Sequence, residues 1–255
     1  MSRFDEIEEI PRKVLTLYYL IDTSGSMCGE KIASLNVAIR ETLPMIAEIS
    51  ANNSDAKIKI AALSFATVNQ WMNPTPVESE DFQWTDLEAG GLTNLGEAYL
   101  ELNNKLSQSR GFMQEATGSF APAIILMSDG GPTDDADHGL ERLKNNNWYK
   151  AAIKVAIAIG DDADTDVLAK FTGNSEAVLR VHNIDQLKTI IRLVSVTASR
   201  VASKSASVGS DAPETKNEET IEAIKNAIEK DPTLEGLDVG GSDSNMGSDN
   251  WGSGW

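Results

Sequence analysis

Three short stretches of the sequence carry carboxylate and hydroxyl side chains of the kind that hold a hard metal ion. The first, DTSGS, places the carboxylate of Asp22 and the hydroxyls of Ser24 and Ser26 at alternate positions. The second, GGLTN, contains Thr93, and the third, SDGGPTD, contains Asp129. Oxygen ligands without thiolate or imidazole suit octahedral Mg²⁺ or Mn²⁺ better than Zn²⁺. The sequence therefore predicts a site for Mg²⁺, with Mn²⁺ as the alternative ion.

A divalent ion held by these residues would recognise an acidic group on a second protein. Two carboxylates that act largely through water leave such an ion electrophilic. The side chain of an Asp or Glu on the partner would then complete the coordination shell and neutralise the site. The predicted chemistry is therefore metal-dependent binding of a protein that donates a carboxylate.

The elements that must position these side chains are buried strands. Residues 14–22 form a near-continuous apolar run that ends at Asp22, and residues 123–128 form a second run that ends just before Asp129. Such runs are typical of strands that are buried on both faces. Thr93 stands near the start of a predicted helix. Because ligands of open α/β sheets bind beyond the carboxyl ends of the strands, we expect the three stretches to converge there.

Strands and helices alternate along most of the chain. The expected strands are residues 14–22, 57–65, 123–128, 153–159 and 177–181, and the expected helices are residues 30–50, 95–109, 135–145, 164–171 and 184–203. This alternation predicts an α/β fold in which a doubly wound, mostly parallel sheet is flanked by helices. Residues 68–84 lack a helical pattern and are compatible with an edge strand or hairpin.

The sequence divides into an N-terminal arm (residues 1–12), one domain (13–203) and an acidic tail (204–255). The tail is rich in Gly, Ser, Asp and Asn and has few large apolar residues, so we expect it to be largely disordered. A capping-box motif followed by spaced isoleucines predicts one short amphipathic helix near residues 216–230. We expect the tail to be a separate interaction element whose removal leaves the melting temperature nearly unchanged. Trp251 and Trp255 are its candidate partner-binding residues.

The bulk composition excludes several classes of partner. The 255 residues have a formal net charge of −17, which disfavours nucleic acid and anionic lipid surfaces. No run approaches the roughly 20 apolar residues that cross a bilayer. The acidic N-terminus lacks a secretory signal, and the single cysteine, Cys28, cannot form an internal disulfide. These features predict a cytoplasmic protein without a membrane partner.

The three stretches together resemble the metal-ion-dependent adhesion site (MIDAS) of von Willebrand factor A (VWA) domains, whose motif is Asp-x-Ser-x-Ser followed by a Thr and an Asp. The resemblance implies a VWA or Rossmann-like fold. It also implies that Ser24, Ser26 and Thr93 provide direct or switchable hydroxyl ligands. By the same resemblance, Asp22 and Asp129 bind the metal largely through water.

The phrases DTSGSMCGEKI, GGLTNLGEAY and LMSDGGPTDD resemble the bacterial TerY-type branch of this family, which is associated with tellurite-resistance and chemical-stress operons. The resemblance covers about residues 13–200. It implies a cytoplasmic scaffold of a stress-response or signalling complex, with a protein kinase and a PP2C-type phosphatase as partners. The expected protein is a non-enzymatic interaction module.

Other interpretations of the same residues stay open. A metal-dependent phosphatase or hydrolase would use the same ion, although the sequence shows no base or nucleophile beside it. A haloacid-dehalogenase-type phosphatase would need a second Asp where Ser24 stands. A subunit of an AAA+ ATPase complex and an extracellular adhesin are further alternatives, and helix capping alone is the simplest one. Residues 162–166 superficially resemble an EF-hand loop, but Val167 occupies its glycine position, so helix capping is the expected role there.

Overall fold

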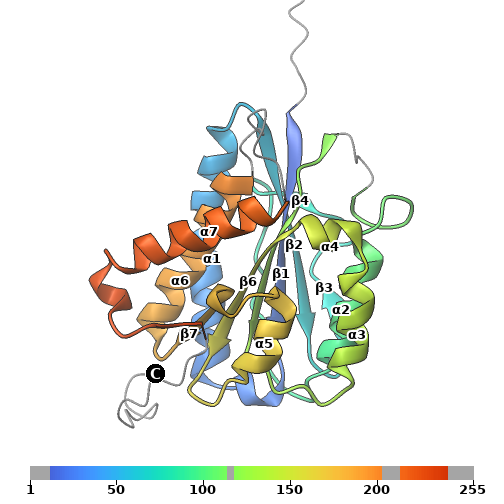
Figure 1. The fold of residues 1–255 in the computed structure, drawn as a ribbon. Coiled ribbons are helices and arrows are strands. Elements are labelled where there is room, and N and C mark those ends of the chain that lie inside the picture. Colours follow the sequence, from blue (N-terminus) through green and yellow to red (C-terminus); the bar gives the residue numbers. More distant parts are fainter. Residues whose placement is uncertain (1–11, 114–117, 203–212, 241–255) are drawn as a thin grey trace, which may run out of the picture.

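The computed structural model describes residues 12–113, 118–202 and 213–240. Its centre is an eight-stranded sheet with helices on both faces (Figure 1). The strands are β1 (Lys13–Asp22), β2 (Ala56–Phe65), β3 (Asn69–Trp71), β4 (Val77–Glu78), β5 (Ala123–Ser128), β6 (Ile153–Ile159), β7 (Val178–Val181) and β8 (Asp238–Val239). Their order is β3-β2-β1-β5-β6-β7-β8, and β4 also pairs with β2.

The five central strands are parallel, as the sequence predicts. β2, β1, β5, β6 and β7 pair in parallel, whereas β3, β4 and β8 are antiparallel additions at the two edges. β3 and β4 fall within the predicted edge-strand segment, residues 68–84. Because parallel strands point the same way, their carboxyl ends meet at one edge of the sheet, which is the lower edge in Figure 1. The sheet therefore has one end at which loops from several strands can meet.

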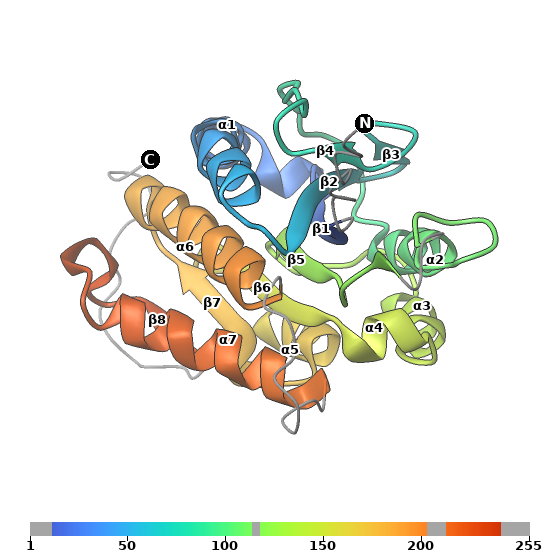
Figure 2. The same ribbon diagram turned by 90° about the horizontal axis from the view of Figure 1, so that it is seen from above.

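Two layers of helices cover the sheet. The helices are α1 (Glu30–Ala51), α2 (Leu95–Lys105), α3 (Ala136–Lys144), α4 (Asn147–Ala151), α5 (Thr165–Thr172), α6 (Ile184–Ala202) and α7 (Pro213–Ile228). α1 and α6 lie on one face, and α2, α3, α4 and α5 lie on the other (Figure 2). Alternate residues of β1 enter the two cores: Leu17 and Tyr19 face α1 and α6, while Tyr18 and Leu20 face α2. Burial on both faces explains why the strand sequence is apolar throughout.

The α2–α3 pair brings the second and third predicted loops together. The two helices cross so closely that a Cβ at Gly139 would lie 2.3 Å from the carbonyl oxygen of Gly96. Asp134, just before α3, accepts hydrogen bonds from the backbone N–H groups of Gly96 (2.9 Å) and Glu97 (3.0 Å) at the start of α2. The carboxylate therefore caps α2 and fixes the loop before α3 against it.

Residues 213–240 pack on the domain, whereas the sequence predicts a largely disordered, separate tail with one short helix. The expected short helix exists as α7, and it lies against α6 with Ile221 and Ile224 buried. Asn217 on α7 also accepts a hydrogen bond from the backbone N–H of Lys154 in β6, at 2.9 Å. A 3-10 turn (Pro232–Leu234) then leads to β8, which pairs with β7. A few well-spaced apolar residues suffice here because the body supplies the other half of each contact, which composition alone does not reveal.

Some sequence predictions lie outside the described residues, and some boundaries differ. Residues 1–11 of the arm, the linker 203–212 and residues 241–255, with Trp251 and Trp255, are outside the described part of the chain. The helix predicted for residues 95–109 ends at Lys105, and α4 was not predicted from the sequence. Within the described segments, no helix is long and apolar enough to cross a membrane.

Candidate metal centre

Backbone hydrogen bonds tie the three predicted loops together at the carboxyl ends of β1 and β5. The first loop contacts the second twice: the N–H of Gly90 donates to the carbonyl of Thr23 (2.8 Å), and that of Gly25 donates to the carbonyl of Gly91 (3.1 Å). The second loop contacts the third through Thr93, whose carbonyl accepts from the N–H of Thr133 (2.8 Å). The convergence expected from the sequence is therefore present in the backbone.

Asp22 is fully buried, and both of its carboxylate oxygens are held. Oδ1 accepts from the backbone N–H of Ser24 (2.8 Å), and Oδ2 accepts from the hydroxyl of Ser128 (2.6 Å). Burial raises the pKa of Asp22, the hydrogen bonds from Ser128 and Ser24 oppose that rise, and the charge of Asp129 adds to it. The two carboxylates thus lie close enough to repel one another, and a bound cation would relieve that repulsion.

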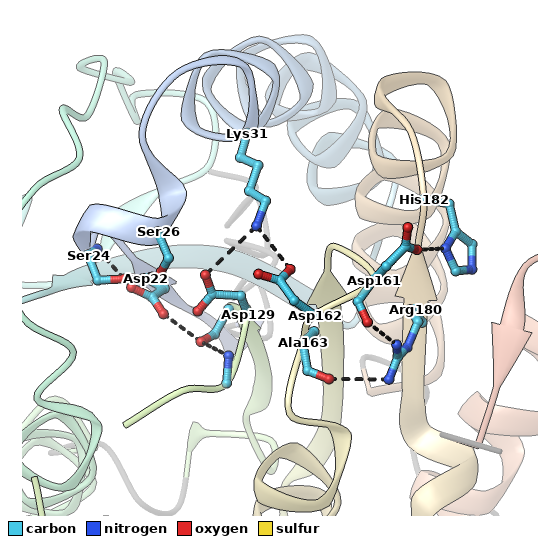
Figure 3. Close-up of polar contacts among 12 residues, drawn as sticks. Asp22, Ser24, Ser26, Lys31, Asp129, Asp161, Asp162, Ala163, Arg180 and His182 are labelled. Atoms are coloured by element: carbon cyan, nitrogen blue, oxygen red, sulfur yellow. Dashed lines mark hydrogen bonds and ion pairs between the residues drawn. The ribbon is translucent and has the colours of Figure 1, made fainter. Parts of the chain in front are cut away.

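The two serines of the first loop present their hydroxyls to each other. Ser24 Oγ lies 3.0 Å from Ser26 Oγ. Ser24 is buried and Ser26 is exposed, so this pair reaches from the interior beside Asp22 to the surface (Figure 3). Gly25 between them approaches the second loop so closely that a Cβ would lie 3.3 Å from the carbonyl oxygen of Gly91. The glycine therefore allows the close contact that aligns the two hydroxyls.

Asp129 is the second buried carboxylate of the site. The residue is 6% exposed, and its Oδ2 is buried without a hydrogen-bond partner among the described residues. A buried carboxylate oxygen without a donor is costly, and almost all such atoms in folded proteins are satisfied. An anionic oxygen without a hydrogen bond, beside a second buried carboxylate, is an arrangement that a bound cation would satisfy.

Thr93 joins the group at the meeting point of the second and third loops. It is 5% exposed, and its backbone N–H donates to the hydroxyl of Thr133 at 3.0 Å. Together with the carbonyl contact, this bond fixes the backbone of Thr93 on both sides. All five predicted residues therefore belong to one connected set of loops, four of them are buried, and Ser26 is at the surface.

The donor set fits a hard divalent cation. Within the described part of the chain there is no group of three or more His, Cys, Asp and Glu residues that could hold a metal. The candidate centre differs from such groups because it combines two carboxylates with hydroxyls. Oxygen donors of this kind suit Mg²⁺ or Mn²⁺.

The sequence itself decides the family. Residues 16–193 match the von Willebrand factor type A domain family over more than half of the chain. The chain belongs to the VWA family. Members of this family are often metal-dependent protein-interaction modules. No curated protein gives a significant match to the sequence.

Solved structures agree on the fold. Proximal thread matrix protein 1 from the mussel byssus, in a structure with a zinc-occupied MIDAS motif, is 17% identical with a TM-score of 0.55, over 74% of this chain and 48% of that protein. A von Willebrand factor type A protein from Catenulispora acidiphila is 15% identical with a TM-score of 0.52, over 73% and 43%. The chain spans less than half the length of either protein. At these identities the likeness shows the VWA fold alone.

Several residues that complete this VWA site were not singled out from the sequence. Ser128 orients Asp22, and Asp134 caps α2. Both stand in the LMSDGGPTDD stretch, in which the motif identifies only Asp129 as a ligand. Asp164 accepts from the N–H of Val167 (3.2 Å) at the start of α5, which confirms helix capping in place of an EF-hand.

Lys31, which the sequence motif does not include, places a positive charge near Asp129. It lies in the first turn of α1, and its Nζ is 3.9 Å from the orphaned Oδ2 of Asp129 and 3.4 Å from Oδ1 of Asp162 (Figure 3). The lysine side chain is only 17% exposed, so solvent screens this charge less than at an open surface. The ammonium therefore partly neutralises Asp129, at a distance too long for a hydrogen bond.

We predict that Lys31→Met strengthens binding of Mg²⁺ by about tenfold, because it removes a positive charge that repels a cation bound by Asp129. Isothermal titration of the purified protein with MgCl₂ measures this change. Lys144→Met, on the exposed side of α3, removes the same charge far from Asp129 and controls for the change in net charge. Equal affinities in wild type and Lys31→Met would show that the ammonium does not act on the site.

Proposed function

We propose that this protein is a VWA-type interaction module that binds an acidic side chain of a partner protein through a divalent cation. Asp22, Ser24, Ser26, Thr93 and Asp129 hold the cation, and Mg²⁺ is the ion that their oxygen atoms suit best. The single observation that carries the proposal is that Oδ2 of Asp129 is buried with no hydrogen-bond partner among the described residues. The ion supplies an electrophilic point to which a carboxylate from outside binds.

The residues of the chain keep that point rigid and open to the surface. Ser128 and the backbone N–H of Ser24 fix both oxygens of Asp22, so this carboxylate stays in place without a cation. The exposed hydroxyl of Ser26 marks the side from which a partner reaches the site. Because the loops are already tied by backbone hydrogen bonds, little ordering is needed when a partner binds.

We propose binding in place of catalysis. Neither histidine is placed to act as a base at the centre: His138 lies exposed on α3, and the Nδ1 of His182 is 2.5 Å from Oδ1 of Asp161, toward β8. The hydroxyls of Ser24 and Ser26 are assigned to the cation and are therefore unavailable as nucleophiles.

The cellular role in the proposal is a scaffold for a cytoplasmic stress-response or signalling complex. It rests on the resemblance of the three motif phrases to the TerY-type branch, which implies a protein kinase and a PP2C-type phosphatase as partners. The lone Cys28 is consistent with a reducing compartment. Trp251 and Trp255 stay a prediction as a second contact with the partner.

Affinity purification with Mg²⁺ and with EDTA, followed by mass spectrometry, tests the proposal. We expect proteins that are retained by the wild-type chain in Mg²⁺ and lost both in EDTA and with Asp129→Ala. Titration of the purified partner then measures the affinity directly. The same set of proteins under all three conditions would refute metal-dependent binding. Phosphatase turnover that Asp129→Ala abolishes would instead show that the centre is catalytic.

A further inference from the structure

Two large apolar side chains stand out on the surface. Val68 is 74% exposed and Leu92 is 54% exposed. All other large apolar side chains that the structure describes are at least partly buried. Scattered exposed apolar residues are ordinary in soluble proteins, so their position decides whether they matter.

Both residues lie at the end of the sheet that carries the candidate metal centre. Leu92 stands between Gly91, whose carbonyl accepts from the N–H of Gly25, and Thr93, a proposed ligand of the cation. Val68 follows the carboxyl end of β2, the strand beside β1. The exposed apolar residues therefore occupy the same end of the sheet as the centre.

Hydrogen bonds join the segments that carry Val68 and Leu92. The N–H of Leu92 donates to the hydroxyl of Thr67 (2.9 Å), and the N–H of Asn94 donates to the carbonyl of Ala66 (3.0 Å). The side-chain amide of Asn94 also donates to the carbonyl of Thr67, at 3.0 Å. The two apolar residues thus stand on adjacent, hydrogen-bonded segments, and we call Val68 and Leu92 the rim.

Backbone contacts hold the two segments that carry Val68 and Leu92. The N–H of Ala66 bonds to the carbonyl of Val68 (3.3 Å), which closes the turn after β2. Gly91 has a φ of +86°, and a Cβ there would lie 2.5 Å from Oγ1 of Thr67. The glycine permits this conformation and the close contact with Thr67, while the hydrogen bonds of Leu92 and Asn94 hold the segment. Exposure of the two side chains is therefore built into these loops.

Carboxylates surround the other parts of the centre. Asp162 is exposed beside Lys31, and Asp164, also exposed, donates its backbone N–H to the carbonyl of Asp129 at 2.7 Å. Asp134 and Asp135 follow Thr133, the residue bonded to Thr93. A ligand with many acidic residues would be repelled by these groups and by the net charge of −17.

We propose that Val68 and Leu92 form an apolar rim that receives an aliphatic side chain of the partner beside the carboxylate that reaches the cation. The partner is a protein segment with one Asp or Glu, an aliphatic residue within three positions of it, and otherwise neutral or basic residues. This inference rests on the proposed function and adds the selectivity of the same site.

Fluorescence anisotropy with labelled peptides tests the rim on the full chain in saturating Mg²⁺. The parent peptide has one Asp in a Gly-Ser-Lys background, and six derivatives carry a single Leu at each of the three positions on either side of that Asp. We expect at least one derivative to bind about three- to tenfold more tightly than the parent, because part of an aliphatic side chain leaves water. A Leu peptide in which Asn replaces Asp should not bind.

Variants separate the rim from the metal. The double variant Val68→Ser with Leu92→Ser should bind the parent peptide and Mg²⁺ as the wild type does, but it should lose the preference for Leu. Gln70→Ser, at an exposed position on β3, is the matched control and should keep the preference.

The possible results separate a failure of the rim from a failure of the proposed function. If no Leu derivative binds more tightly than the parent, or if the double variant keeps the preference, the rim is refuted and the proposed function stands. If the parent peptide does not bind, or binds equally well as its Asn version, the proposed function fails and the rim fails with it.

Discussion

Replacing Asp129 with alanine is expected to lower the affinity for Mg²⁺ by roughly 100-fold or more, while the metal-free protein remains at least as stable as the wild type. The affinity falls because the variant loses a charged ligand. Stability is preserved because Oδ2 of Asp129 is buried without a hydrogen-bond partner in the described structure, and Lys31 is 3.9 Å away. The variant loses the long ion pair with Lys31, but it also removes the cost of a buried carboxylate oxygen that has no hydrogen bond.

Asp162→Ala is the matched control for this effect. Asp162 also faces Lys31, at 3.4 Å, and it carries the same charge, but its side chain is 76% exposed and lies outside the proposed ligand set. We expect its Mg²⁺ affinity to stay within about threefold of wild type, because an exposed charge is strongly screened. Isothermal titration gives the affinities, and thermal melting in EDTA gives the stabilities. Similar Mg²⁺ affinities for Asp129→Ala and wild type would rule out Asp129 as a ligand.

Removing residues 205–255 is expected to lower the melting temperature by roughly 5 to 10 °C, although the sequence alone predicted almost no change. The deletion takes away α7 and β8, and with them the buried side chains of Ile221, Ile224 and Leu234. It also exposes the edge of β7 and frees the N–H of Lys154 from Asn217. These losses exceed the conformational entropy that the released segment regains.

Point variants on α7 assign that loss to packing. Ile224→Ala should destabilise the protein by about 2 to 4 kcal/mol, because the side chain is 2% exposed in the core that includes α6. Asn226→Ala, on the exposed side of the same helix, should change the free energy of unfolding by less than about 0.5 kcal/mol. Differential scanning calorimetry compares the deletion and both variants. A truncated protein that melts within a degree of wild type would show that α7 adds no stability.

The sequence alone was enough to predict the parallel sheet and the five candidate ligands. Apolar runs ending at Asp22 and just before Asp129 identify strands that are buried on both faces. Parallel strands must end on one side, so the loops that follow them meet. Thr93 could be added because it stands near the start of a predicted helix, and the helices of such a sheet begin beyond the carboxyl ends of the strands. The family match to residues 16–193 confirms the VWA domain that these stretches indicated.

Only the tertiary structure decided which charges and apolar residues surround those ligands. The approach of Lys31 to Asp129, the orphaned Oδ2 and the rim of Val68 and Leu92 depend on distances between segments that are remote in sequence. The packing of α7 also depends on segments that are remote in sequence. Its sparse isoleucines look insufficient for burial until α6 and β6 supply the opposing surface. Periodicity reports the faces of one element, whereas packing depends on what the other elements place against them.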